Sequence, residues 1–583
     1  MRKASLAKRV NVLSKKSMLR KLKLHWYRHF SIGDDGGDFR AKSKIRDRHS
    51  SIGDEGGDFR VKLELYWDRD YSIGDECYDL QVLEELQPHP NLHELSIEGF
   101  RGARFPRWMS NGSLLPNLKS MMISNCSNCD HNLSFGELAC LERLGIMNMS
   151  NVKSIGGSKD KQMDTTTTPQ SSSYSCLKVL ELGRMPNLEE WFEGNEVCYE
   201  ELSITSCPNL RMTPHSFPSL KSLKLEDVGG TGVVSITSSL TSLTSLSITR
   251  CEDLEFLPEG LLRNNDQLII FNVEKCPKLQ AFKEEGLMVS NSSSLRELQI
   301  GMCDALKSIP DLRGLTSLQK LEIRSCGELE MIPKGFWSSF IALESLNVFG
   351  CKRLKGTIEL SPSSKHLREV RIVYCANLER FDICSSSSTQ QQLVLFSCCH
   401  TLEIYNCNAI SSIDLRSFAS LRELNITECS GLHALQGLPF LTALEELELG
   451  PFSEDLDFFP LLLGGNYDDD NGDEVASNTP LLPSLRKLES RGWPALQALP
   501  HHLQHLTMLK SLIIQDFTSL TELPEWMGNL TSLEELQIIW CANLTHLPSK
   551  EQMQRLTFLK RLWIFNCSRL MARCRRDGPD LNI

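Results

Sequence analysis

The stretch from Leu318 to Leu354 contains the same phrase twice, and this phrase decides the fold. It first reads Leu318-Gln-Lys-Leu321-Glu-Ile323-Arg-Ser-Cys326-Gly-Glu-Leu329, and it returns as Leu343-Glu-Ser-Leu346-Asn-Val348-Phe-Gly-Cys351-Lys-Arg-Leu354. The shared unit is L-x-x-L-x-[IV]-x-x-C-x-x-L. A unit this short cannot bury its apolar positions alone, whereas stacked units can bury them against each other. The phrase therefore predicts an array of repeated coils.

Further copies extend this array along most of the chain, at a spacing of roughly 23 to 27 residues. They begin near Leu92, Leu118, Leu141, Leu177, Leu202, Leu220, Leu243, Leu268, Leu295, Leu318, Leu343, Leu367, Leu402, Leu421, Leu444, Leu485, Leu509, Leu533 and Leu559. Many copies end in a Leu-Pro or Ile-Pro step, which leaves the strand and favours an extended return. The pattern predicts a leucine-rich-repeat solenoid of the α/β repeat class. In this horseshoe, a parallel β-sheet forms the concave face, and irregular or short helical returns form the convex face.

Breaks in the period divide the chain into five predicted regions. They are divergent N-terminal repeats with duplicated polar loops (1–90), the main array (91–452), an acidic loop insertion (453–483), C-terminal repeats (484–570) and a tail (571–583). A second polar insertion covers 158–175. Both insertions are poor in apolar residues and are expected to be exposed loops. If the array consists of two arcs, we expect the break between them at 453–483.

The N-terminal region contains a local duplication. The decapeptide Ser31-Ile-Gly-Asp-Asp-Gly-Gly-Asp-Phe-Arg40 recurs at 51–60, and a shortened copy begins at Ser72. A strand-like stretch, Leu19-Arg-Lys-Leu-Lys-Leu-His-Trp26, recurs as Val61-Lys-Leu-Glu-Leu-Tyr-Trp67. The Gly/Asp-rich copies are predicted to be loops. A calcium loop is the functional alternative, but the ligand spacing and closing Glu of an EF-hand are missing.

The overall composition favours a cytoplasmic protein, with the nucleus as the alternative compartment. The 583 residues carry a net charge of −11, which argues against a general nucleic-acid binder. The basic start has no apolar core like that of a signal peptide. No apolar run is long enough to span a bilayer. We therefore expect no nucleic-acid partner and no membrane span.

The 21 cysteines occupy mainly one position of the repeat. This position holds Cys126, Cys207, Cys251, Cys276, Cys303, Cys326, Cys351, Cys375, Cys407, Cys429, Cys541 and Cys567, and in other repeats Phe100, Met149, Met185, Val228, Phe452, Trp493 or Phe517. A position that accepts Cys, Met, Val, Phe and Trp is an apolar packing site. Spacing alone does not exclude disulfides between neighbouring coils, but the substitutions favour buried free thiols.

No motif indicates catalysis or a cofactor. The sequence contains no G-x-x-x-x-G-K-[ST] phosphate loop, and the Gly-rich stretch Gly229-Gly-Thr-Gly232 has no Lys. Cys126 and Cys129 with His131 resemble half of a zinc site, but a second pair at the required spacing is missing. Cys398-Cys399-His400 offers a Cys/His pair that nothing else supports. We expect a non-enzymatic protein with no cofactor and no metal.

The residue between the two inward apolar residues of each strand points outward and forms a column across the sheet. Aromatic residues stand one or two positions further along several strands. Aligned aromatics on a rigid surface are typical of protein-binding hot spots. We predict a protein-binding surface formed by Phe349, Arg371, Tyr374, Glu403, Tyr405, Ile513, Gln537, Ile539, Trp540, Trp563 and Phe565. For Trp563 and Phe565, capping of the last coil is an equal alternative.

One block resembles a known family. The sequence Gln87-Pro-His-Pro-Asn-Leu-His-Glu-Leu-Ser-Ile-Glu-Gly-Phe100, followed by Phe105-Pro-Arg-Trp-Met109, is similar to the early repeats of plant nucleotide-binding leucine-rich-repeat disease-resistance proteins of the coiled-coil class. The later Cys-containing units resemble the intracellular repeats of that family. The resemblance covers the repeat region, and the duplicated start matches least well.

The resemblance implies a recognition module of plant innate immunity. Its partner would be a pathogen effector, a guarded host protein or a nucleotide-binding switch domain. Nucleotide binding and cell-death signalling do not carry over, because this sequence contains no phosphate loop. Two alternatives remain open at this point: a substrate-recognition subunit of a ubiquitin ligase, and a truncated product without its own partner.

Overall fold

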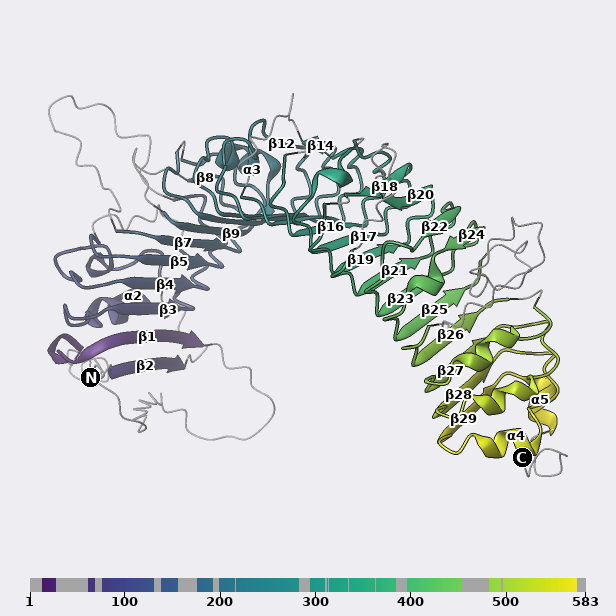
Figure 1. Cartoon of the computed structure of the whole chain (residues 1–583). Coiled ribbons are helices and arrows are strands. Elements are labelled where there is room, and N and C mark those ends of the chain that lie inside the picture. Colours follow the sequence, from purple (N-terminus) through teal and green to yellow (C-terminus); the bar gives the residue numbers. More distant parts are fainter. Residues whose placement is uncertain are drawn as a thin grey trace, which may run out of the picture. The chain divides into compact units, whose positions relative to one another are not determined.

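The computed structural model describes residues 13–27, 61–68, 76–129, 138–155, 176–191, 199–214, 216–282, 294–309, 312, 314–333, 335–361, 363–383, 396–452, 482–493 and 496–573. Its contacts divide the chain into two compact units, Met1–Glu285 (unit 1) and Gly286–Ile583 (unit 2). In each unit, parallel strands lie side by side along one face, and return segments run along the other (Figure 1). The predicted leucine-rich-repeat solenoid with a parallel sheet is confirmed.

The sheet of unit 1 is built from one short strand per coil. In the order of their pairing, the strands are β2 (Val61–Asp68), β1 (Leu19–Tyr27), β3 (Glu94–Glu98), β4 (Ser120–Ser124), β5 (Arg143–Met147), β7 (Val179–Gly183), β9 (Glu201–Cys207), β10 (Ser222–Val228), β11 (Ser245–Thr249) and β13 (Ile270–Glu274). All these pairings are parallel, and from β3 onward they follow the order of the chain.

The duplicated strands at the N-terminus depart from that order. Strand β1 pairs with β3 on one side, where Leu22 lies opposite Leu95, and with β2 on the other, where Leu22 lies opposite Leu63. The second copy, β2, therefore lies outside the first. The predicted polar loops at 31–40 and 51–60 lie outside the described residues, as does the start of the third copy at 72–75.

The sheet of unit 2 follows the chain throughout. Its strands are β15 (Glu297–Gly301), β16 (Lys320–Arg324), β17 (Ser345–Phe349), β19 (Glu369–Val373), β21 (Thr401–Tyr405), β23 (Glu423–Thr427), β25 (Glu446–Gly450), β26 (Lys487–Arg491), β27 (Ser511–Gln515), β28 (Glu535–Ile539) and β29 (Arg561–Phe565).

The acidic insertion does not interrupt this sheet. Strands β25 and β26 pair directly, with Glu446 opposite Lys487 and Leu447 opposite Leu488. The division between the two units falls after Glu285, and not at 453–483, where we expected a break between arcs. Almost all of the two insertions, 158–175 and 453–481, lies outside the described residues.

From β3 onward, the described coils turn inward through one residue with a left-handed backbone. In β16 the side chains of Leu321 and Ile323 are buried, and Ser325, just after the strand, has φ 51°. The same conformation precedes the Cys position in other coils, at Gly99, Asn125, Asn148, Arg184, Ser206, Asp227, Arg250, Lys275, Met302, Gly350, Tyr374, Asn406, Glu428, Gly492, Asp516, Trp540 and Asn566. This turn ends the strand and directs the next side chain into the core.

The side chain that follows the turn is buried in every coil described. All twelve cysteines predicted at this position are buried, and none of them forms a disulfide. The residues that replace cysteine in other coils are also buried: Phe100, Met149, Met185, Val228, Phe452, Trp493 and Phe517. The thiol of Cys126 donates a hydrogen bond of 3.3 Å to the carbonyl oxygen of Ser124, the last strand residue. Cysteine therefore fits because it is small, apolar and able to satisfy a carbonyl at the turn. The prediction of buried free thiols is confirmed.

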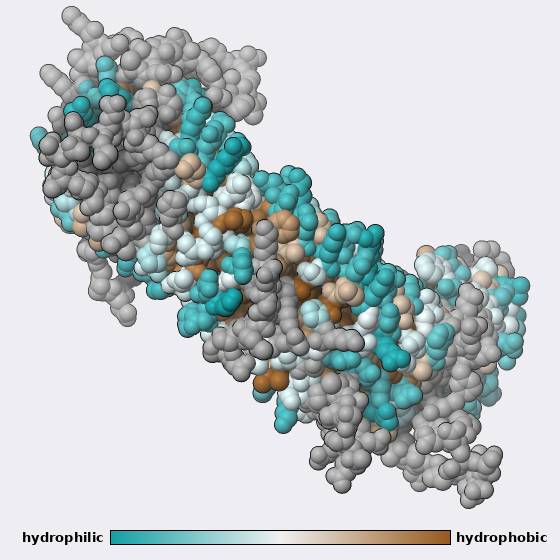
Figure 2. Space-filling model, turned by 90° about the horizontal axis from the view of Figure 1, so that it is seen from above, coloured by the Kyte–Doolittle hydropathy of each residue, from teal (hydrophilic) through white to brown (hydrophobic). Residues whose placement is uncertain are grey.

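The returns are short and varied, as predicted. They contain the strands β6 (Ser154–Ile155), β8 (Glu190–Trp191), β12 (Phe256–Leu257), β14 (Ala281–Phe282), β18 (Thr357–Leu360), β20 (Arg380–Ile383), β22 (Ser412–Asp414) and β24 (Ala434–Gln436), the helices α2 (Glu76–Glu85), α3 (Gly230–Thr237), α4 (Lys550–Arg555) and α5 (Ser568–Arg573), and the 3-10 turns η1 (Leu13–Lys15), η2 (Arg107–Met109), η3 (Trp337–Ser339), η4 (Leu438–Phe440), η5 (His501–His505) and η6 (Glu525–Asn529). Helix α5 crosses the predicted boundary between the last repeat and the tail. On this side of the molecule, apolar groups lie among polar ones (Figure 2).

The Gly-rich stretch at 229–232 is a packing device. It opens α3, and a Cβ atom at Gly232 would lie 2.4 Å from the carbonyl oxygen of Leu210 in the preceding coil. From the following coil, the Asp253 carboxylate accepts a hydrogen bond of 2.7 Å from the Gly230 N–H. The glycines therefore let a helix lie directly on the backbone of neighbouring coils.

Candidate functional site

The exposed face of the unit 2 sheet brings the predicted site residues together by strand register. Arg371 lies opposite Glu403 in the β19–β21 pair, and Gln537 lies opposite Trp563 in the β28–β29 pair. Because neighbouring parallel strands are about 4.8 Å apart, side chains at equivalent positions are in direct contact range. The face contains three chemically different parts.

The first part is an aromatic ladder formed by Phe349, Tyr374 and Tyr405. The Phe349 and Tyr374 ring centroids are 5.5 Å apart, those of Tyr374 and Tyr405 are 5.1 Å apart, and both pairs meet edge to face at 87°. Phe349 and Tyr405 end their strands, whereas Tyr374 occupies the left-handed turn after β19. This one-residue offset puts the Tyr374 ring between the other two. Phe349 and Tyr374 are 40% and 39% exposed, which is high for stacked aromatic rings.

Polar groups fix the edge of the ladder. A hydrogen bond with the Tyr374 hydroxyl raises the pKa of Tyr405. The Arg371 guanidinium forms ion pairs with Glu369 on its own strand and with Glu403 at 3.5 Å. The Arg371 side chain remains half exposed.

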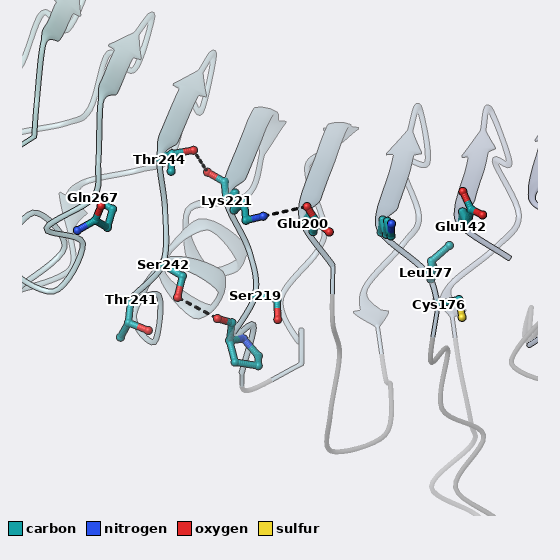
Figure 3. A pocket seen from close by; sticks show the side chains of 12 residues that line it. Glu142, Cys176, Leu177, Glu200, Ser219, Lys221, Thr241, Ser242, Thr244 and Gln267 are labelled. Atoms are coloured by element: carbon teal, nitrogen blue, oxygen red, sulfur yellow. Dashed lines mark hydrogen bonds and ion pairs between the residues drawn. The ribbon is translucent and has the colours of Figure 1, made fainter. Parts of the chain in front are cut away.

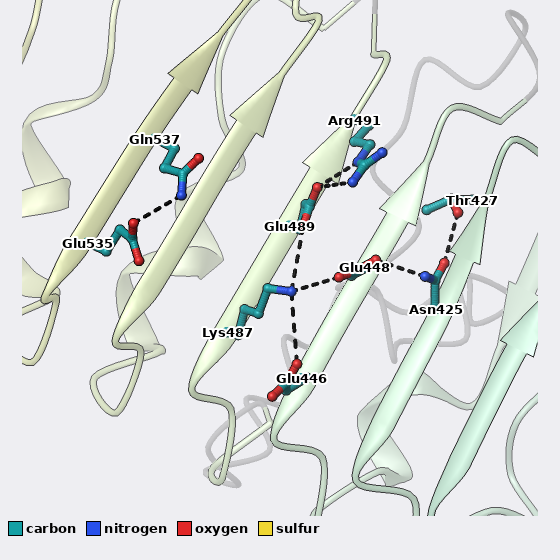
Figure 4. Close-up of polar contacts among 9 residues, drawn as sticks. All are labelled: Asn425, Thr427, Glu446, Glu448, Lys487, Glu489, Arg491, Glu535 and Gln537. Atoms are coloured by element: carbon teal, nitrogen blue, oxygen red, sulfur yellow. Dashed lines mark hydrogen bonds and ion pairs between the residues drawn. The ribbon is translucent and has the colours of Figure 1, made fainter. Parts of the chain in front are cut away.

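The second part is a polar network centred on Lys487 (Figure 4). The Lys487 ammonium lies 2.7 Å from Glu448, 3.7 Å from Glu489 and 3.9 Å from Glu446. Burial alone would lower the pKa of Lys487, but these carboxylates together raise it. Arg491 donates to Glu489 at 2.7 Å. The outward acidic residues of β25 and β26 are thus neutralised within the sheet.

The network continues onto the preceding strand. The Asn425 amide donates to Glu448 at 2.8 Å, and the Thr427 hydroxyl donates to Asn425 at 2.8 Å. Glu489 is nearly fully buried although it occupies an outward position. These contacts make a rigid polar surface next to the aromatic ladder.

The third part is the C-terminal patch, formed by Trp540, Trp563 and Phe565 with the half-buried Ile539 and Gln537. The three aromatic side chains are strongly exposed, and Trp563 reaches 60%. Trp540 occupies the left-handed turn, with φ 56°, and its N–H donates to the carbonyl oxygen of Phe565. Gln537 donates to Glu535 at 3.0 Å (Figure 4).

Ile513 departs from the prediction. It occupies an outward position of β27, between Glu489 and Gln537, but it is only 9% exposed. Neighbouring side chains cover Ile513 on the sheet face, so it offers little surface to a partner.

Comparison with known proteins agrees with this repeat architecture. The family described as R13L1/DRL21 LRRs matches residues 61–149 and 495–567. The chain is 28% identical over 262 residues to putative disease resistance RPP13-like protein 1 of Arabidopsis thaliana, covering 42% of this chain and 24% of that protein. It is 33% identical over 207 residues to disease resistance protein RGA2 of Solanum bulbocastanum, covering 34% of this chain and 21% of that protein.

The leucine-rich repeats of this chain are similar to those of plant disease-resistance proteins. The matches span about a quarter of the length of those relatives, 24% and 21%. Residues 495–567 of the repeat region, which match the family, contain the C-terminal patch, whereas the aromatic ladder lies between the two matched segments.

The repeat region also has a groove in unit 1, with a volume of about 780 Å³ (Figure 3). Charged side chains of alternating sign line it where the chain enters successive strands: Glu142, Lys178, Glu200 and Lys221. Lys221 and Glu200 are paired at 3.0 Å, and the Ser242 hydroxyl donates to the Pro218 carbonyl at 2.9 Å. These two contacts link neighbouring coils.

Among the residues that the structure describes, no cluster of three or more His, Cys, Asp or Glu side chains could hold a metal ion. Cys126 and Cys129, half of the zinc alternative, are both buried, and Cys126 bonds a backbone carbonyl. His131 lies outside the described residues. Within the described part of the repeat region, no helix is long and apolar enough to cross a membrane.

Two features of the site were missed from sequence. The column of outward residues was assigned correctly, but the burial of Glu489 and Ile513 was not anticipated. The left-handed turn was also missed, although it decides where Tyr374 and Trp540 point. Repeated Gly, Asn and Asp residues just before the Cys position, such as Gly350, Asn406 and Asp516, were the available signal, since these residues tolerate that conformation best.

Proposed function

We propose that the exposed sheet face of unit 2 is a non-catalytic protein-recognition surface in plant innate immunity. The observation that carries the proposal is the aromatic ladder, in which Phe349 and Tyr374 stay about 40% exposed although they are fixed by edge-to-face stacking. Rigid exposed aromatics lose little conformational entropy on binding, which is why they dominate hot spots. The similarity to plant disease-resistance proteins supplies the biological setting.

The surface combines the ladder, Arg371 with Glu403, and the C-terminal patch. The Lys487 network between them is internally satisfied, so it would orient a partner without giving much affinity. In this proposal the partner is a pathogen effector, a guarded host protein or a nucleotide-binding switch domain, and the protein acts in the cytoplasm. For Trp563 and Phe565, capping of the last coil remains the competing role.

The test compares three full-length proteins by affinity purification from plant lysate and quantitative mass spectrometry. One is the parent, one carries Phe349→Ala, Tyr374→Gly and Tyr405→Ala, and one carries Met331→Ser, a strongly exposed apolar residue of a return segment. We expect one or more partners to bind the parent and the Met331 variant equally. The ladder variant should lose them by at least about tenfold, equivalent to about 1.4 kcal/mol.

Each candidate partner is then produced alone and titrated against the three proteins. A partner whose affinity is the same for parent and ladder variant would contradict recognition by the ladder. If the ladder variant still binds the partner, and a variant with Trp540→Gly and Trp563→Ala does not, the binding site is the C-terminal patch.

A further inference from the structure

The last two coils bring the thiols of Cys541 and Cys567 together. Each cysteine follows its strand by two residues, and β28 and β29 pair in register, with Ile539 opposite Phe565. This register places the two thiols at equivalent positions of adjacent coils. Neighbouring strands lie about 4.8 Å apart, within the Cα separation of about 4.4 to 6.8 Å that a disulfide bridges.

The backbone holds both sulfurs in place. Cys567 Sγ lies 3.4 Å from the carbonyl oxygen of Phe565 and 3.5 Å from that of Ile538. Cys541 Sγ lies 3.5 Å from the carbonyl oxygen of Ile539 and 3.9 Å from that of Ile514. Both side chains therefore point into the same interior column.

The coil that carries Cys567 is covered less than any coil before it in unit 2. Leu562 is 41% exposed, whereas Leu536, at the same position of the preceding coil, is fully buried. Helix α5, of six residues, follows Cys567 and buries Leu570, but Met571 beside it is exposed. Because few apolar contacts hold this coil, its local opening costs less than that of inner coils.

The hydrogen bond with Cys541 also lowers the pKa of Cys567, to about 7, while the pKa of Cys541 is raised. Cys567 is therefore the more readily ionised thiol of the pair. The thiolate is the reactive form of cysteine. Among inner members of the column, burial raises the pKa of Cys207 to about 12, whereas a hydrogen bond with Cys276 lowers the pKa of Cys251.

We propose that Cys541 and Cys567 form a peroxide-sensitive thiol pair that closes into a disulfide between the last two coils. The Cys567 thiolate attacks one oxygen of hydrogen peroxide, the O–O bond breaks, and a sulfenic acid and hydroxide form. The Cys541 sulfur then attacks the sulfenic sulfur, the S–O bond breaks, and water leaves with the Cys541 proton. One peroxide is reduced by two electrons, and the coil of Trp563 and Phe565 becomes linked to that of Trp540.

The matched control is the pair Cys375 and Cys407, in two inner coils. Each of these thiols also lies two residues after its strand, and the strands β19 and β21 also pair in register. Further coils cover this pair on both sides. Both cysteine pairs therefore join adjacent strands that pair in register. They differ because further coils lie on both sides of the inner pair.

The experiment treats the full chain with hydrogen peroxide, blocks free thiols at set times, and quantifies linked peptides by mass spectrometry. We expect the Cys541–Cys567 link to form at least about ten times faster than the Cys375–Cys407 link, since opening of the end coil is easier. Equal rates for the two pairs, no link under conditions that oxidise glutathione, or a link from Cys567 to Cys574 instead would each overturn the proposal.

Two variants separate the roles of the thiols. Valine occupies the same column position at Val228, so Cys541→Val and Cys567→Val are expected to preserve the fold, which circular dichroism melting checks. With Cys541→Val, dimedone should trap a sulfenic acid on Cys567. With Cys567→Val, Cys541 should stay unmodified. Equal labelling of Cys541 in the second variant would contradict the assigned order of attack.

Discussion

Gly350 and Tyr374 occupy the same position of adjacent coils, and both have a left-handed backbone, with φ 68° and 56°. Glycine adopts this conformation freely, whereas tyrosine is strained in it by roughly 1 kcal/mol. Tyr374, the central residue of the aromatic ladder, therefore occupies a position at which glycine would be less strained. The same left-handed turn recurs at this position in other coils, and in this coil it carries an exposed aromatic ring.

This strain gives a test that separates binding from stability. We expect Tyr374→Gly and Tyr374→Ala to weaken partner binding equally, because both remove the ring. Tyr374→Ala keeps the strained backbone and should be less stable than Tyr374→Gly by about 1 kcal/mol. Native-state hydrogen exchange of β17, β19 and β21 measures the stability, and titration with a purified partner measures the affinity. Equal exchange protection in the two variants would refute the argument from strain.

The close approach of α3 to its neighbouring coils predicts a large effect from one methyl group. Because a Cβ at Gly232 would lie 2.4 Å from the Leu210 carbonyl oxygen, Gly232→Ala forces the helix away from the coil. We expect a loss of about 1–3 kcal/mol in local stability, read from hydrogen exchange of α3 and β10. Gly327→Ala is the control, since its Cβ would meet nothing closer than 3.7 Å. If both variants lose the same protection, packing of α3 is not the cause.

Burial of the cysteine column predicts a sharp contrast in thiol reactivity. Cys140 and Cys176 are exposed, whereas burial raises the pKa of Cys126 and of Cys207 to about 12. In the native protein we expect alkylation of Cys140 and Cys176 within minutes, and of Cys126 and Cys207 only after denaturation. Isotope-coded alkylation with mass spectrometry gives the rate for each thiol. Native reaction of Cys126 at the rate of Cys140 would show that the column is open to solvent.

In the Lys487 network one ammonium group pairs with three carboxylates, so its removal is expected to destabilise this part of the sheet. Lys487→Ala leaves Glu448 and the nearly buried Glu489 without that ammonium, and we expect local stability to fall by about 1–3 kcal/mol. Lys510→Ala removes only a more exposed pair with Glu534 and should cost less than about 1 kcal/mol. Hydrogen exchange of β25 and β26, compared with β27 and β28, distinguishes the two. A larger effect from Lys510→Ala would contradict the assignment.

The repeat phrase predicted most of the fold, because every coil uses the same few residues for the same purpose. Leu321, Ile323 and Cys326 are all buried as their spacing required. The order of the duplicated strands could not be predicted, because β1 and β2 have similar sequences and either could pair with β3. The division after Glu285 was likewise missed, since the repeat phrase recurs on both sides of it.

The sequence predicted which positions of the strands point outward, but it did not predict how exposed each side chain is. Alternation along a strand identifies an outward position, and Trp563 and Ile513 satisfy it equally. Their exposure differs because Ile513 lies between two strands, whereas Trp563 lies on the last one. Neighbouring side chains decide burial on a sheet face, and a repeat pattern does not give their sizes and rotamers.

Strand β2 joins the sheet outside β1, although it follows β1 in the chain. The repeated strand β2 thus lies at the edge of the unit 1 sheet, and the pairing of β1 with β3 is intact. Duplication of a strand can therefore lengthen the sheet without separating two strands that are already paired. A repeat array can therefore gain a strand at the edge of its sheet while the strand pairs that follow keep their register.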